Sequence, residues 1–152
     1  MRRPRFRLKQ AIGGLALLLV PTGSGAWGQE AARYAVVVHA SNPSTALKRT
    51  QVSEIFLKKV RVWKETRAPI LPVDQSERSM VRASFSKDVH GRSVAAIRNY
   101  WQQMIFSGRG VPPPEAASDK QVVDFVRANP GAIGYVSSEA VPRDLKVLEV
   151  LE

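Results

Sequence analysis

The stretch PVDQSERSMVRASF, residues 72–85, decides the fold class, because it joins a strand directly to a helix. The run 68–75 is apolar, but Pro69 and Pro72 cannot donate to a sheet ladder, which predicts a short strand or one at a sheet edge. A helix is predicted over residues 77–88. The side chains of this helix that we expect to face the core are Met80, Val81, Ser84 and Phe85.

Three further runs of β-branched and apolar residues predict strands, at residues 34–40, 132–138 and 145–152. The first run, YAVVVHA, is apolar without alternation, which is typical of a strand covered on both faces of its sheet. Gly134 in the second run is expected to allow close packing of the backbone. Because strands alternate with helices, we expect an α/β fold with a mixed, mostly parallel sheet flanked by helices.

Caps and apolar stripes with spacings of three and four predict three more helices. One begins at a Thr50 cap, one covers residues 93–106, and one follows a capping box of Ser118 and Gln121 and runs through Ala128. Trp101 and Ile105 lie on the apolar stripe of the second helix, so we expect both to be core residues. Trp63 has two interpretations, because it either pins its connection or stacks on a ligand.

The first 28 residues have the order of a secretory signal peptide, which is a basic segment, an apolar segment and small residues. The apolar segment covers residues 11–20 and is shorter than the about 20 residues that span a bilayer. We predict cleavage after Gly28, which leaves residues 29–152 as a single periplasmic domain. An uncleaved anchor is the alternative, and general secretion is favoured because RRPRF only loosely resembles a twin-arginine signal.

Charge gives only a weak indication of partners. Removal of the predicted signal peptide lowers the formal net charge from +10 to +5, because five basic and no acidic residues leave with it. The remaining basic residues are spread along the chain, and no nucleic-acid motif is present. We therefore expect no nucleic-acid partner, a mild preference for anions, and contact with a membrane only through the signal peptide before cleavage.

Enzymatic activity is not predicted. The sequence contains no cysteine, no nucleophile elbow, no catalytic triad pattern and no phosphate or dinucleotide fingerprint. The two histidines, His39 and His90, are too few and too far apart for a zinc pattern. We expect no cofactor and no metal.

The junction at residues 76–79 has a structural and a functional interpretation. A strand that runs into a helix N-terminus leaves unpaired N–H groups, and these together with the helix dipole favour an anion. Ser76 and Ser79 would add hydroxyl donors, and Arg78 and Arg82 would add positive charge. Alternatively, Ser76 is an ordinary N-cap.

Four stretches together resemble a known family, the phosphate-binding periplasmic proteins of ABC transporters. These stretches are VSEIFLKKVRVWKE (52–65), ILPVDQSERSMVRASF (70–85), NYWQQMIFSGRG (99–110) and VVDFVRANPGAIGYVSSEAV (122–141). The family has two lobes with the anion between them, and the length of this chain is similar to one lobe only. The resemblance thus implies the fold of one lobe of a type II periplasmic binding protein.

The resemblance also implies where a ligand would bind. When the family's phosphate-binding segment is laid on this sequence without gaps, Gln75 takes the place of an Arg, Glu77 that of an acidic residue and Ser79 that of a Ser. Met80 and Val81 replace the Gly and Thr of the family. The implied ligand-binding residues, with the two neighbours that complete the segment, are Gln75, Ser76, Glu77, Arg78 and Ser79.

Two functions follow as hypotheses. The first is a periplasmic solute-binding-like protein that binds phosphate or another small oxyanion weakly, for transport or sensing, with a transporter permease or a sensor protein as partner. The second is a non-enzymatic interaction or signalling module that kept the lobe and lost the ligand. Its expected surfaces are the basic connection 58–64 and the loop around Arg109, although the loop's glycines also have a purely structural explanation.

Overall fold

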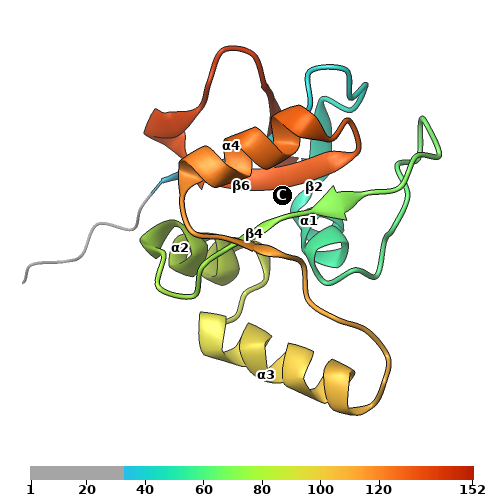
Figure 1. Ribbon diagram of the computed structural model, residues 1–152, viewed down its shortest axis with the longest axis vertical. Coiled ribbons are helices and arrows are strands. Elements are labelled where there is room, and N and C mark those ends of the chain that lie inside the picture. The colour runs from blue at the N-terminus through green and yellow to red at the C-terminus, as the bar shows by residue number, and fades with distance from the viewer. Residues whose placement is uncertain (1–32) are drawn as a thin grey trace, which may run out of the picture.

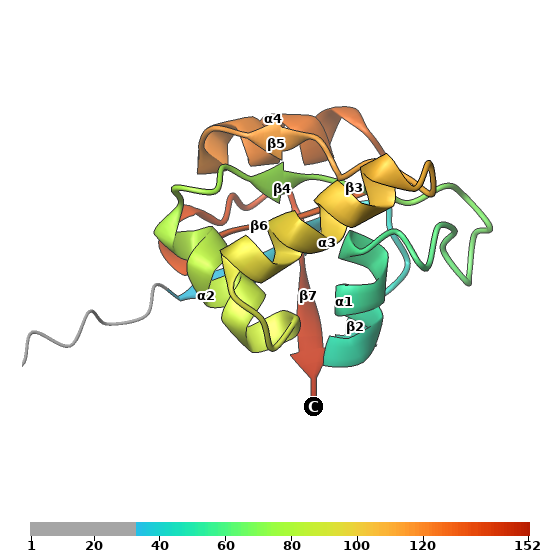
Figure 2. The same ribbon diagram turned by 90° about the horizontal axis from the view of Figure 1, so that it is seen from below.

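The structure is a computed structural model of the chain and describes residues 33–152, so the predicted signal peptide and its cleavage site lie outside the described residues. Figures 1 and 2 show a sheet with helices on both sides. The strands are β1 Tyr34–Val38, β2 Ala46–Lys48, β3 Leu71–Pro72, β4 Asp74–Gln75, β5 Glu115–Ala116, β6 Ala132–Ser137 and β7 Lys146–Leu151. The helices are α1 Arg49–Phe56, α2 Met80–Val89, α3 Val94–Phe106, α4 Asp119–Ala128 and the short 3₁₀ helix η1 Ser138–Ala140.

The main sheet is mixed, with the strand order β2-β7-β1-β6-β3. Its central strand β1 runs antiparallel to both neighbours, and the register places Val37 opposite Gly134 and Val147. Parallel pairing occurs at the two edges, between β2 and β7 and between β3 and β6, and also in the separate pair of β4 and β5. The predicted α/β class with a mixed sheet is confirmed, and the strand that contains Pro72 lies at a sheet edge as expected. The sheet is not mostly parallel, because its long strands β1, β6 and β7 pair antiparallel.

The core has two parts, one on each face of the sheet. On one face, Val36, Ile133 and Tyr135 pack with aromatic side chains of α1 and α2. On the other face, α4 covers β6 (Figure 2), and Gly134 lies so close to it that a Cβ atom there would be 2.5 Å from Val122 Cγ1. The predicted role of Gly134 in close packing is therefore confirmed.

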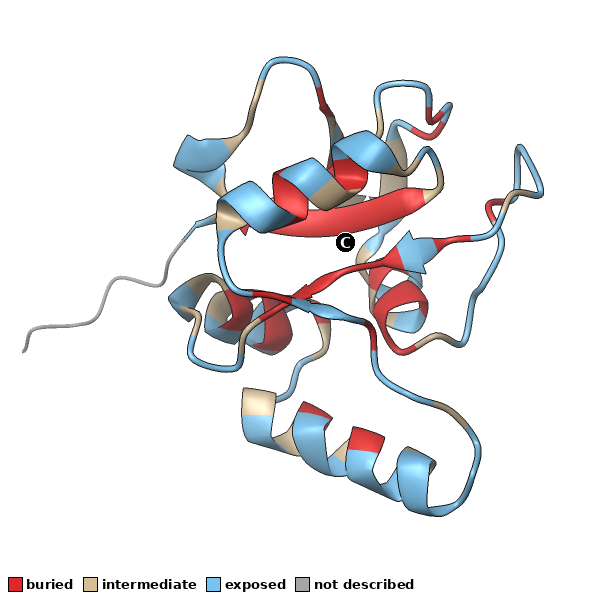
Figure 3. Cartoon of the chain, in the orientation of Figure 1, coloured by how far each residue is buried: buried red, intermediate tan, exposed pale blue. Residues whose placement is uncertain are grey.

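Helix α3 is attached to the main body by a narrow contact. Its buried side chains are Ile97 and Trp101, which pack against Leu57. Most of the rest of its surface is exposed (Figure 3), and Ile105, which we expected in the core, is 50% exposed. The prediction for Trp101 is confirmed and the prediction for Ile105 is wrong, because a helix with neighbours on one side only buries a thin stripe.

Several local predictions differ from the structure. Helix α1 is capped at Lys48, whose N–H donates to Gln51 Oε1 at 2.9 Å, and the predicted cap Thr50 lies inside the helix. Helix α2 begins after Ser79 and buries Arg82, Phe85, Ser86 and Val89. Met80 and Ser84 are therefore not on its core face, and Met80 is 50% exposed. Phe85 is buried as predicted, and Val81 is partly buried and packs against the core. The short strands β2 and β5 were not predicted.

The length and the apolar character of a helix decide whether it can cross a bilayer. None of the helices within residues 33–152 is both long enough and apolar enough to cross a membrane.

Candidate functional site

The strand-to-helix junction consists of β4, a turn and the first residues of α2. Ser79 is the N-cap of α2, and its hydroxyl oxygen accepts a hydrogen bond from the Arg82 N–H at 3.2 Å. The same hydroxyl donates to Gln75 Oε1 at 2.5 Å. The cap is therefore Ser79 rather than Ser76, and both roles of the Ser79 hydroxyl are occupied by the chain itself.

Gln75 points into the protein. Its residue is only 3% exposed, and its side-chain amide donates to Asp119 Oδ1 at 2.7 Å and to the backbone carbonyl of Tyr135 at 2.9 Å. These contacts connect β4 to the N-terminus of α4 and to β6. The side chain that stands in the family's Arg position thus joins three elements of the lobe.

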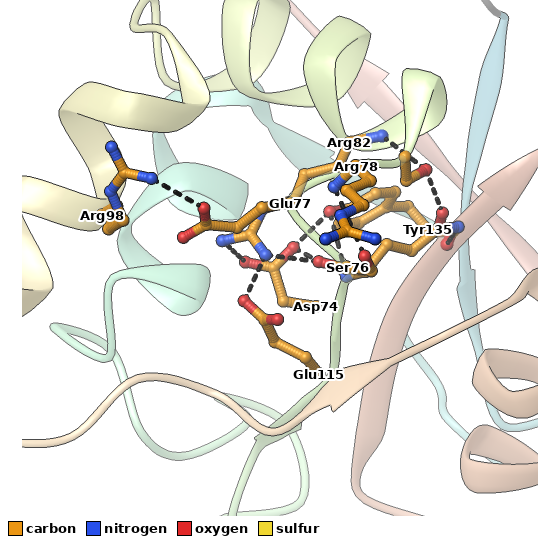
Figure 4. A network of polar contacts seen from close by, with 10 residues as sticks. Asp74, Ser76, Glu77, Arg78, Arg82, Arg98, Glu115 and Tyr135 are labelled. Atoms are coloured by element: carbon orange, nitrogen blue, oxygen red, sulfur yellow. Dashed lines mark hydrogen bonds and ion pairs between the residues drawn. The ribbon is translucent and has the colours of Figure 1, made fainter.

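The other three predicted residues lie in the turn before α2. The Ser76 hydroxyl accepts from the Arg78 N–H at 3.3 Å, and Glu77 forms an ion pair with Arg98 of α3 at 3.0 Å. Glu77 and Arg78 are exposed and Ser76 is half-buried. The five predicted residues therefore separate into two whose side chains bond within the chain, Gln75 and Ser79, and three in the turn. Figure 4 labels the three turn residues, Ser76, Glu77 and Arg78.

A buried arginine lies at the centre of the junction. The Arg82 guanidinium forms ion pairs with two carboxylates, with Asp74 at 3.3 Å and with Glu115 through Nη1. Nη1 also donates to the backbone carbonyl of Gln75, whereas Arg82 Nε is buried without a hydrogen-bond partner among the described residues. We call Asp74, Arg82, Glu115 and Tyr135 the Arg82 cluster (Figure 4).

Tyr135 completes the cluster from β6. Its ring stacks on Phe85 with centroids 3.8 Å apart, and this contact positions its hydroxyl to donate to Asp74. Asp74 also accepts from the Gln75 N–H at 2.9 Å. All the polar contacts of Asp74 come from donors, as an ionised carboxylate requires.

Burial and charge act in opposite directions in the cluster. Burial raises the pKa of Asp74 above its ordinary value, while Arg82, the Tyr135 hydroxyl and the Gln75 N–H oppose this rise. Burial disfavours the charge on Arg82, but Asp74 and Glu115 raise its pKa above the ordinary value. Two carboxylates against one guanidinium give the cluster a net negative charge, so an added anion would have to displace a carboxylate. Glu115 has a side chain that is 46% exposed and is the one that can be displaced.

Most members of the Arg82 cluster were missed at the level of sequence. Asp74, Glu115 and Tyr135 were not singled out, and Arg82 was noted only as a nearby charge. The positions 82, 85, 86 and 89 have the spacing of a buried helical face, and this pattern would have indicated that Arg82 points inward.

Within residues 33–152, no group of three or more His, Asp or Glu side chains is placed to hold a metal ion.

Trp63 has a structural role. It is 3% exposed, and its indole N–H donates to the carbonyl oxygen of Gly131 at 3.0 Å. The interpretation that Trp63 pins its connection is confirmed. In the loop after α3, Gly108 has a positive φ of 65° and ends the helix, so the structural explanation of this glycine is also confirmed.

Comparisons with known proteins agree with this fold. The family model described as the PBP superfamily domain matches residues 30–149. A solved structure from Clostridium perfringens, described as a phosphate ABC transporter substrate-binding protein with bound phosphate, has a TM-score of 0.64 at 24% identity and is matched over 80% of this chain and 46% of its own. An ABC-type phosphate transport receptor from Vibrio cholerae has a TM-score of 0.62 at 22% identity, with 77% of this chain and 45% of its own covered. The chain thus spans about half the length of these proteins. Among curated proteins, none matches the chain.

Proposed function

We propose that the chain, which belongs to the PBP superfamily domain family, is an exported solute-binding lobe. Its proposed ligand is a small oxyanion, phosphate first, which binds with low affinity at the start of α2. The observation that carries this proposal is the Arg82 guanidinium. It is buried at the strand-to-helix junction, it has an N–H group without a partner among the described residues, and one of its two carboxylates is half-exposed.

Glu115 is the group that an oxyanion would replace. Its carboxylate has the charge and the acceptor oxygens of an oxyanion, and it contacts Arg82 Nη1 from the solvent side. Arg82 lies in the first turn of α2, where N–H groups have no partner within the helix and the helix dipole favours negative charge. The Arg82 N–H itself donates to the Ser79 hydroxyl, so an anion at this place would meet the guanidinium and the positive end of the helix dipole.

The affinity is expected to be low. Asp74 stays within 3.3 Å of the guanidinium and compensates its charge, so the anion exchanges with one carboxylate instead of meeting a free cation. Gln75 and Ser79 already bond to each other, which leaves Ser76 and Arg78 at the surface as the remaining side chains that can contact the ligand. Contacts of exposed charges contribute about 1 kcal/mol or less.

Location and partners follow from the same proposal. The signal peptide predicted for residues 1–28 would export the domain to the periplasm, and a transporter permease or a sensor protein would receive the loaded lobe. The similar proteins from Clostridium perfringens and Vibrio cholerae support the ligand class, since they are described as phosphate transport proteins.

Calorimetric titration of the protein with phosphate, sulfate and acetate tests the proposal. We expect weak saturable binding of phosphate, and tighter binding in Glu115→Gln, because the amide removes the competing negative charge. Glu139→Gln is the matched control, since Glu139 is exposed in η1, outside the Arg82 cluster. No saturable heat at millimolar phosphate in either the wild-type protein or Glu115→Gln would refute the proposal.

One observation favours the second hypothesis, an interaction module that kept the lobe. The donors that the resemblance implied for a ligand are satisfied inside the chain, because Ser79 donates to Gln75 and Gln75 donates to Asp119 and Tyr135. Light scattering and pull-down from a periplasmic extract test this alternative. A strict monomer with no partner and with measurable phosphate binding would count against it.

A further inference from the structure

A second place in the lobe gathers positive charge. A cavity of about 460 Å³ lies where the end of α1, the connection that follows it and the loop after α3 meet. Lys58 and Arg61 line it from the connection, and Arg109 lines it from the loop. Residues about fifty positions apart in the sequence therefore converge, and they belong to the two basic segments that the sequence indicated separately.

The charge in this cavity is not compensated by the chain. None of the residues that line it is acidic, and none of the ion pairs found within residues 33–152 includes Lys58, Arg61 or Arg109. The contacts of Lys58 Nζ and Arg61 Nε go to neutral carbonyl oxygens, those of Pro112 and Lys58, at 3.0 and 3.1 Å. Burial and the neighbouring Arg61 lower the pKa of Lys58, which shows the mutual repulsion of these cations.

Lys58 has a side chain at a backbone position that favours glycine. Lys58 follows the C-terminus of α1 with a positive φ of 54°, a conformation that favours glycine. A lysine in this position keeps the side chain, which reaches across to the carbonyl of Pro112 after α3. Glycine would suit the backbone better but would remove one of the three cations.

The rest of the lining is apolar. Leu57, Ile70 and Trp101 are each less than 10% exposed and line the cavity as its buried side chains. The accessible lining is divided between polar and apolar surface, so the cavity can hold a small organic molecule that has both kinds of group. The arrangement therefore fits a ligand with an apolar body and a negative group, rather than an inorganic anion alone.

We propose that the cavity between α1 and the loop after α3 binds a small organic carboxylate, whose apolar body contacts Trp101 and Ile70 and whose carboxylate contacts Lys58, Arg61 and Arg109. This site is separate from the Arg82 cluster, and the proposal for it does not depend on the oxyanion proposed there. Its donors are charged, so the contacts to the carboxylate are of the stronger, charge-assisted kind.

Titration with 3-phenylpropionate, followed by tryptophan fluorescence, tests the proposal. We expect a saturable change that is lost in Trp101→Phe and that the uncharged analogue 3-phenylpropanol does not reproduce. The double variant Arg61→Ala/Arg109→Ala should bind about tenfold or more weakly, since each tenfold corresponds to about 1.4 kcal/mol of contact energy. Both side chains are exposed, so the fold should persist, and circular dichroism checks this.

The controls separate this site from the other. Arg143→Ala removes an exposed arginine that does not line the cavity and should leave the binding unchanged. Glu115→Gln should change phosphate binding but not the binding of 3-phenylpropionate. Equal binding of the alcohol and the carboxylate, an unaffected double variant, or no saturable response from the wild-type protein would each overturn the proposal.

Discussion

Replacement of Arg82 by methionine tests whether the buried ion pair holds the strand-to-helix junction together. Arg82 and Asp74 are 3% and 7% exposed, so the substitution leaves a buried carboxylate without its cation. It also removes the donor to the Gln75 carbonyl and to Glu115. Breaking a buried pair by removal of one partner costs about 3–5 kcal/mol of unfolding free energy. This is a large share of the about 5–15 kcal/mol that stabilises a typical domain.

A second substitution distinguishes the charge from the packing. In Arg82→Met the loss arises mainly from the stranded charge of Asp74, so the double variant Asp74→Asn/Arg82→Met should recover part of it. An amide at position 74 carries no charge. Its Oδ1 can still accept hydrogen bonds from the Tyr135 hydroxyl and the Gln75 N–H, as the Asp74 Oδ1 does. If packing alone determined the loss, the second substitution would not help.

Urea denaturation, followed by circular dichroism, measures these differences, with the slope m as a check that the transition stays two-state. Arg98→Ala is the matched control, because its pair with Glu77 joins side chains that are 50% and 35% exposed, and it should cost about 1 kcal/mol or less. The reasoning is refuted if Arg82→Met costs no more than Arg98→Ala at an unchanged m, or if the double variant is no more stable than Arg82→Met.

Three other predictions concern stability. Gly134→Ala should lower the unfolding free energy by about 1–3 kcal/mol, because the new methyl group would overlap Val122. The control in the same urea assay is Gly110→Ala, because a Cβ atom at that position would have its nearest neighbour at 3.9 Å. Burial, with Arg92 and Arg82, lowers the pKa of His90 to about 4. The stability that neutral His90 contributes is therefore complete above pH 6.5. It falls as the pH drops toward 4, by up to about 3 kcal/mol of unfolding free energy. His90→Asn should flatten the profile in this window, and an unchanged slope would contradict the assignment. Lys58→Gly should keep the unfolding free energy or raise it by up to about 1 kcal/mol, because glycine adopts the positive φ without strain. The same variant should weaken carboxylate binding, because it removes a cation. A loss of stability would count against strain at this residue.

Much of the fold was predictable because its signals are local. Strands β1 and β6 are apolar runs, and helices α3 and α4 begin at the predicted caps Ser93 and Ser118. The short strands β2 and β5, of three and two residues, exist only through their pairing with distant segments, so no local pattern announces them. Helix α2 was placed too early, because Ser76 and Ser79 are both good cap residues, and the sequence does not show which of them the buried Gln75 side chain contacts.

The candidate site was predicted only in outline. Sequence reasoning proposed the junction and the residues Gln75 to Ser79 as a ligand site, which stays a prediction, and it did not single out the buried charges beside them. Asp74 and Tyr135 are 61 positions apart, and Arg82 and Glu115 are 33 apart, so the cluster depends on the order of strands in the sheet. Arg82 itself was noted only as a nearby charge, because arginine is almost never fully buried unless it is paired and its partners are distant in the sequence.

The two places where we propose that anions bind differ in what an anion must displace, and the salt dependence of binding measures this difference. At the Arg82 cluster a ligand exchanges with Glu115, and the guanidinium it reaches is only 3% exposed, so the contact is little screened by dissolved ions. At the cavity no carboxylate of the described chain has to leave, but Arg61 and Arg109 are exposed. Charges of this kind are screened over a Debye length of about 8 Å at physiological ionic strength. Carboxylate binding at the cavity should therefore weaken steeply as salt rises, whereas phosphate binding at the cluster should weaken only slightly. Equal salt dependence of the two ligands would mean that both bind at the same exposed site, and the assignment of phosphate to Arg82 would then be wrong.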